Sequence, residues 1–256
     1  MLTSLKYEFR RSRSSLIVLA VIFALLEGFF LFNIHRDKDS WIAISIVLLV
    51  LASIAMFFYV LFSSVSAYKR DIEQKSGYLV FMTPISTYAV IGAKLLCTLI
   101  TGIGIVVFIG VLAVIDWDIL VDNVGGLKFG INLVKQIFKS LDIPYDQILL
   151  GIIAMTLMFL ISFYLLVAIA YLAISLSSTI LQNKKGKNII SFIFFIALYV
   201  IVTVISNKIP KPYSATDNLD LLKVFIRFLP QYLFFIVVSV ACFFGSAWLL
   251  ENKISL

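Results

Sequence analysis

The chain has 256 residues, of which 62% are hydrophobic and 14% are charged. Soluble domains carry about 25% charged residues and about 45–50% apolar ones, so the composition excludes an ordinary soluble protein and indicates a membrane protein. The net charge of +7 comes from lysines and arginines grouped beside apolar segments, where such residues anchor a chain at anionic lipid. The charge therefore gives no reason to expect nucleic-acid binding.

Six apolar segments are long enough to cross a bilayer core of about 30 Å, which takes about 20 residues of helix. They cover roughly residues 15–34, 41–68, 90–115, 147–176, 189–206 and 229–250. We therefore expect an all-α fold with six transmembrane helices that form a single transmembrane domain over residues 1–256.

Three segments outside these spans have the spacing of amphipathic helices. Residues 1–14 place Leu2, Leu5 and Phe9 opposite Lys6 and Arg10, which is typical of a helix lying in the membrane interface; the alternative is a basic tail. The loops over residues 116–146 and 207–228 each contain a similar pattern. We expect these two loops to lie outside the cell, and we expect the first of them to cap the structure, with a substrate contact as the alternative.

The basic residues predict the orientation of the chain in the membrane. The dense segments "FRRSR", "YKR" and "NKKGK" lie next to the ends of spans, and such segments stay in the cytoplasm. The loop over residues 116–146 instead holds five aspartates against three lysines. We expect both termini to be cytoplasmic.

Small or uncommon residues inside the spans predict packing more than chemistry. Cys97 and Cys242 lie in apolar runs and behave as small hydrophobic residues, and His35, the only histidine, has no partner for a metal site. Glycines and serines in the third and fourth spans allow helices to approach closely: Gly102, Gly104, Gly110, Ser175, Ser177 and Ser178. We expect no metal centre.

The segment "YKRDIEQKSGYLVFMTPISTYAVIGAK", residues 68–94, is a polar island between two apolar spans. Arg70, Asp71, Glu73 and Lys75 have helical spacing and can pair with one another. We therefore expect a cytoplasmic loop over residues 69–89 that begins as a charged helical turn.

The second half of this loop contains breaks and a helix start. Gly77 can turn the chain, and the Thr83–Pro84 step places a boundary before the proline. Ser86 or Thr87 can then cap the next helix. A helix, a kink and a second helix would make a surface that docks onto a soluble partner; the alternative is an ordinary interfacial loop.

Residues in this loop are similar to those in the first cytoplasmic loop of the ABC transporter permeases of type 2. The matching residues are Arg70-Asp71, Glu73, Lys75-Ser76-Gly77, Met82-Thr83-Pro84-Ile85-Ser86 and Gly92-Ala93-Lys94-Leu95. The opening "LKYEFRRSRSSL" and the plan of six spans resemble that family as well.

The resemblance implies a permease subunit that pairs with a second permease, identical or related, and binds two cytoplasmic ATPase subunits. Its loop would be the coupling helix that couples ATP hydrolysis to transport. On this reading, the residues that contact the ATPase are Arg70, Asp71, Glu73, Lys75, Gly77, Met82, Thr83, Pro84, Ile85 and Ser86. The chain has no G-x-x-x-x-G-K-[ST] phosphate-binding loop, so we expect no cofactor in this chain, with ATP and Mg²⁺ bound by the partner.

Glu27 is an acidic residue well inside the first span, and such a residue is a functional candidate because a buried charge is costly in a membrane. It can face a substrate pathway together with Tyr59 and contact a cationic or amphipathic substrate. Alternatively, it can stay protonated or bond a polar neighbour such as Tyr59, Ser63 or Tyr171.

The resemblance implies export, and the apolar, aromatic spans suit an amphipathic substrate, such as a peptide or toxin, with a drug or a lipid as further candidates. The cell membrane of a bacterium is the expected location. A membrane scaffold or channel subunit is the alternative function. An intramembrane protease is disfavoured because His35 lies at the membrane edge and Glu27 has no predicted acidic partner within a span, so we expect the chain not to be an enzyme.

Overall fold

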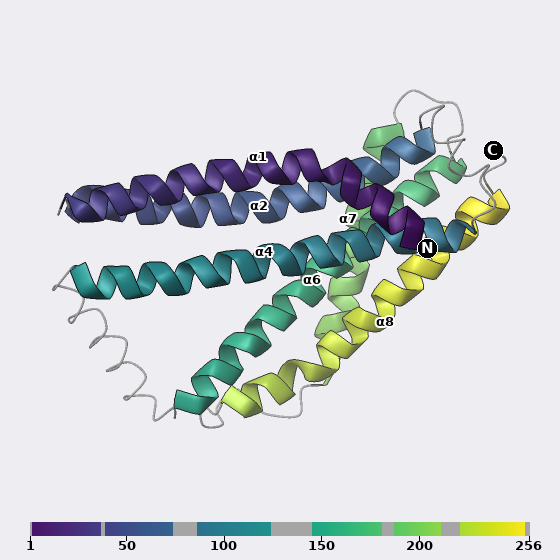
Figure 1. The fold of residues 1–256 in the computed structure, drawn as a ribbon. Coiled ribbons are helices and arrows are strands. Elements are labelled where there is room, and N and C mark those ends of the chain that lie inside the picture. The colour runs from purple at the N-terminus through teal and green to yellow at the C-terminus, as the bar shows by residue number, and fades with distance from the viewer. Residues whose placement is uncertain are drawn as a thin grey trace. The chain divides into compact units, whose positions relative to one another are not determined.

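The computed structural model describes residues 2–36, 39–73, 86–123, 145–180, 187–210 and 221–253. These residues form six α-helices (Figure 1). The helices are α1 (Leu2–His35), α2 (Asp39–Glu73), α4 (Thr87–Asn123), α6 (Tyr145–Ile180), α7 (Lys187–Asn207) and α8 (Leu221–Lys253).

Each of the six helices contains a stretch that is long and apolar enough to cross a membrane. This confirms the predicted helical fold class and the six predicted spans, and it indicates a multi-pass membrane protein. Five helices have 33 to 37 residues, or about 50–55 Å at 1.5 Å per residue. They are longer than the roughly 30 Å hydrocarbon core, so parts of them extend beyond it.

The helices run past the ends that hydropathy assigns to the spans. Residues 2–14 are continuous with α1, residues 116–123 continue α4, and residues 221–228 begin α8. The structure does not set these segments apart as separate amphipathic helices, because polar residues end an apolar stretch without breaking a helix. The rest of the predicted loops, residues 74–85, 124–144 and 211–220, lies outside the described residues.

Contacts divide the chain into two compact units, and α1, α2 and α4 contribute to both. The first unit contains Met1–Lys6, Leu61–Leu99 and Ile143–Leu256. In it, α6 packs against α8 and α7, around a buried cluster made of Leu165, Ala168 and Ile169 of α6 and Cys242 of α8. Partly buried side chains surround this cluster: Leu172, Phe195, Leu198, Val202, Phe235 and Val238.

The second unit consists of Tyr7–Val60 and Ile100–Asp142, and it holds most of α1 together with parts of α2 and α4. Asn33 Nδ2 of α1 donates to Ser45 Oγ of α2 at 2.9 Å. The rings of Phe23 in α1 and Phe108 in α4 meet edge to face, with 5.6 Å between centroids. A few polar and aromatic contacts therefore join these helices, while many of their other apolar side chains face outward, as a lipid environment permits.

The small residues divide into two groups. Ser175, Ser177 and Ser178 of α6 are buried, as expected for residues that let helices approach closely. Among the described residues, no atom lies within 4 Å of where a Cβ of Gly104 or Gly110 would stand. Close packing is therefore confirmed for the serines and is wrong for these two glycines within their own unit.

Candidate functional site

An ion pair between α2 and α4 lies at the base of the segment that the loop prediction singled out. Lys94 Nζ is 2.5 Å from Asp71 Oδ2, and the two side chains are 3% and 11% exposed. Asp71 lies in the last turn of α2, and Lys94 lies two turns into α4. The pair therefore links the two helices between which residues 74–85 run.

The two charges of this pair stabilise each other in their buried position. Burying an unpaired lysine or aspartate in an apolar interior costs roughly several kcal/mol of folding free energy, because the protein does not replace the water that hydrated the charge. The Asp71 carboxylate supplies the opposite charge and an acceptor for the Lys94 ammonium group. The arrangement thus fixes the spacing of α2 and α4 at this level, since separating the helices would break this buried ion pair.

Tyr68, one helical turn before Asp71, ties the same end of α2 to α6. Its ring stacks on that of Tyr171, with 4.0 Å between centroids and 5° between planes. Its hydroxyl lies 2.5 Å from Ser175 Oγ, and it also makes a hydrogen bond with Ser246 of α8. Tyr68 is 1% exposed, so its polar atom depends on these serines.

A second set of hydroxyl groups connects α2 with α4 and α6 one helical turn before Tyr68. Ser64 Oγ lies 2.6 Å from Thr98 Oγ1 of α4 and 2.8 Å from the Tyr171 hydroxyl. Thr98 Oγ1 in turn donates to the backbone carbonyl of Lys94 at 2.9 Å. We call Ser64, Tyr68, Asp71, Lys94, Thr98, Tyr171 and Ser175 the loop-base network.

Ser86 caps the start of α4. It is one of the two residues that the sequence predicted as the cap. The backbone N–H of Ala89 donates to Ser86 Oγ at 3.4 Å, and the N–H groups of Ala89 and Val90 also reach the Ser86 carbonyl oxygen, at 2.9 and 3.2 Å. These contacts satisfy N–H groups that the first helical turn leaves free. The cap confirms Ser86, one of the two predicted residues, as the residue that precedes the first turn of α4.

The structure separates the residues predicted to contact an ATPase. Arg70 is exposed near the end of α2, whereas Asp71 is buried and paired with Lys94. Glu73 is the last residue of α2. The remaining predicted contacts, Lys75, Gly77, Met82, Thr83, Pro84 and Ile85, lie outside the described residues.

Sequence reasoning missed the partner of Asp71. It paired this residue with charges in its own helical turn, because neighbouring charges are the ones a sequence shows. The available signal was Lys94, which stands among apolar residues in "IGAKLLC". A lysine in such surroundings needs an acidic partner at the same membrane depth, and Asp71 lies at the facing end of the preceding span.

The carboxyl group of Glu27 in α1 lies beside that of Asp116 in α4 and interacts with it. The prediction that Glu27 has no acidic partner within a span is wrong, because α4 continues as helix through Asp116 instead of ending before it. A hydrogen bond between two carboxyl groups requires one of them to carry a proton, since a carboxylate can only accept.

One oxygen of each carboxyl group is buried: Glu27 Oε2 and Asp116 Oδ1. A catalytic carboxyl pair has to reach its substrate and a water molecule, so this burial favours a structural role for the pair. Tyr59, the other candidate for a substrate pathway, is partly buried in α2.

Within the described residues, no group of three or more histidine, cysteine, aspartate or glutamate side chains is placed to hold a metal ion. Cys97 and Cys242 are buried and form no disulfide bond with each other. His35 is exposed at the end of α1.

Comparison of the chain with protein-family models, with curated proteins and with solved structures gave no match.

Proposed function

We propose that the chain is the permease subunit of an ABC-type exporter that works with two separate cytoplasmic ATPase subunits. The observation that carries the proposal is the Asp71–Lys94 ion pair. It closes the base of the segment whose residues resemble the coupling loop of that family, and it lies where a force on this loop would enter the membrane helices.

The loop-base network suits the transmission of such a force. A segment held at both ends passes a displacement to α2 and α4 together. These helices have 35 and 37 residues, and each contributes to both compact units. Movement at the base would therefore reach both units through continuous helices, and Tyr68 and Tyr171 would pass it to α6.

This mechanism assigns different roles to neighbouring residues. Arg70, Glu73 and the residues from Lys75 to Ser86 would provide the surface that contacts the ATPase. Asp71 would instead be a positioning residue, because its carboxylate is already engaged by Lys94. ATP and Mg²⁺ would be bound by the ATPase, and a second copy or a related permease would complete the pathway.

An amphipathic substrate, such as a peptide or a toxin, is the proposed cargo, since the spans offer apolar and aromatic side chains with few charges. The proposed location is a bacterial cell membrane with both termini in the cytoplasm. This orientation places the loop-base network at the cytoplasmic ends of α2 and α4.

The proposal is tested by co-purification in detergent with an ATPase encoded beside this gene. We expect the wild-type chain to retain the ATPase and a variant with Glu73→Ala and Pro84→Ala to lose it. Asp71→Asn should retain the ATPase, while substrate-stimulated ATP hydrolysis falls in reconstituted vesicles, because the loop still binds but its base is loosened.

Pro210→Ala is the matched control. Pro210 lies just after the last residue of α7, on the side of the membrane that is predicted to be outside the cell. It should behave as the wild type in both assays. If no ATPase co-purifies with the wild-type chain, the exporter proposal is wrong and the scaffold or channel function takes its place.

A further inference from the structure

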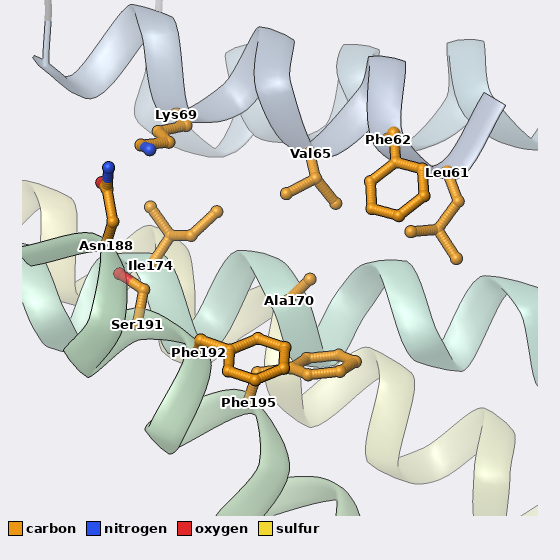
Figure 2. A pocket seen from close by; sticks show the side chains of 10 residues that line it. All are labelled: Leu61, Phe62, Val65, Lys69, Ala170, Ile174, Asn188, Ser191, Phe192 and Phe195. Carbon is orange, nitrogen blue, oxygen red and sulfur yellow. The ribbon is translucent and has the colours of Figure 1, made fainter. Parts of the chain in front are cut away.

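A pocket of about 230 Å³ lies in the first unit between α2, α6 and α7. Its walls are mostly apolar, and its polar side chains are Lys69, Asn188 and Ser191. Figure 2 shows these three at one end, with Lys69 facing Asn188 across the opening, and Leu61 and Phe62 at the other end. The pocket is therefore amphipathic along its length.

The polar end of the pocket is suited to an anion. Lys69 provides a cation, and Asn188 provides an amide that can donate hydrogen bonds. Asn188 and Ser191 belong to the first turns of α7, which begins at Lys187, and the start of a helix carries free N–H groups and a partial positive charge.

The apolar end is suited to a hydrocarbon chain and opens toward lipid. Val65 of α2 and Phe195 of α7 point into the space between their helices (Figure 2). Phe192 lines the same wall and is 61% exposed. An exposed phenylalanine on a membrane-spanning helix faces acyl chains, so the pocket is continuous with the bilayer.

The depth of the pocket in the membrane fits a lipid whose phosphate group lies at the polar end and whose acyl chain lies at the apolar end. α7 has 21 residues, or about 31 Å, which is close to the thickness of the hydrocarbon core. Its first turn therefore lies at a membrane surface, where phosphate groups of lipids are found. Lys69, near the end of α2, lies across the pocket from this first turn of α7 (Figure 2).

We propose that this pocket binds an anionic phospholipid, with the phosphate group at Lys69 and Asn188 and one acyl chain between Val65, Phe192 and Phe195. The pocket is smaller than the roughly 300–1,000 Å³ of sites that enclose a drug-sized ligand. It therefore holds the first part of one chain, while the rest of the lipid stays in the bilayer. This inference does not depend on the exporter proposal.

Native mass spectrometry of the full chain in a neutral detergent tests the proposal, with phosphatidylglycerol and phosphatidylcholine of equal chain length as probes. We expect one phosphatidylglycerol molecule to bind more tightly than phosphatidylcholine. Lys69→Gln should weaken phosphatidylglycerol binding about fivefold and leave phosphatidylcholine binding nearly unchanged. Val65→Phe, which narrows the apolar part, should weaken the binding of both lipids.

Two controls make the same changes elsewhere. Lys208→Gln removes a lysine at the opposite end of α7, and Val237→Phe adds the same side chain at an exposed position of α8. Both should bind phosphatidylglycerol as the wild type does. Lys69→Gln changes a partly exposed residue, so it tests the headgroup contact even if Val65→Phe does not fold.

Three results would overturn the proposal. The first is equal binding of the two lipids by the wild-type chain. The second is equal weakening by Lys69→Gln and Lys208→Gln, which would indicate general surface charge. The third is displacement of the lipid by millimolar inorganic phosphate alone, which would show that the acyl chain makes no contribution to binding.

Discussion

Asp71 and Lys94 form an ion pair at 2.5 Å in surroundings that leave 11% and 3% of their side chains exposed. Asp71→Ala should therefore destabilise the protein by about 3–5 kcal/mol, because it leaves the Lys94 charge buried without its partner. Thermal unfolding in detergent measures this change. Arg70→Ala is the control, since Arg70 is exposed at the preceding position of the same helix, and it should have little effect.

The double variant Asp71→Leu with Lys94→Leu separates the cost of a lone charge from the value of the pair. Replacing both charges by apolar residues of moderate size removes the desolvation cost as well as the attraction. The double variant should be more stable than either single leucine variant. Additive losses would show that the two charges act independently, contrary to the structure.

Tyr68 contributes through its ring and through its hydroxyl group, and two substitutions distinguish them. Tyr68→Phe keeps the stack on Tyr171 and loses the hydrogen bond to Ser175, so it should cost about 1–3 kcal/mol. Tyr68→Ala also removes a fully buried ring and should cost about 3–5 kcal/mol. Tyr199→Phe, at a side chain that is 43% exposed, should be close to neutral in the same unfolding assay.

The close approach of the Glu27 and Asp116 carboxyl groups predicts that one of them carries a proton inside the protein. Infrared spectroscopy should detect its carbonyl band, which should disappear in Glu27→Gln, because the new amide can donate to Asp116 without a shared proton. The stability of Glu27→Gln should stay within about 1 kcal/mol of the wild type. A band that persists in both Glu27→Gln and Asp116→Asn would show that the proton belongs to other groups.

Gly245 marks a close approach of α8 to α6. A Cβ at this position would lie 3.2 Å from Leu172 Cδ1, so Gly245→Ala requires only a small shift of that side chain. Gly245→Leu should lower the unfolding temperature clearly, because the larger side chain forces the two helices apart. Gly104→Leu is the matched control, as its Cβ meets no atom of the described residues within 4 Å. Equal losses at the two glycines would contradict the packing of α6 against α8.

The positions of the six spans could be predicted because a run of about 20 apolar residues has few alternatives to a membrane helix. The predicted span over residues 189–206 nearly coincides with α7. The ends of the longer helices could not be predicted, since hydropathy reports where apolar residues stop and not where a helix ends. Asp116 shows the difference: it was placed in a loop, yet it belongs to α4.

The location of the candidate site could be predicted from the sequence, but the contacts between its side chains could not. Loop composition and the resemblance directed attention to residues 68–94, and the capping role of Ser86 followed from local rules. The Asp71–Lys94 pair and the stack of Tyr68 on Tyr171 join helices that are distant in sequence. Contacts of this kind depend on how helices pack, which a single sequence does not specify.

The described part of α7 has 21 residues, fewer than any other of the six described helices. A helix of about 31 Å has almost no excess length for tilting, so a thicker bilayer would draw Lys187 and Asn207 toward hydrocarbon. Such hydrophobic mismatch is relieved by local thinning of the bilayer, at a modest cost for each ångström. The length of α7 therefore makes membranes with a hydrocarbon core of about 30 Å or less the favoured environment of this protein.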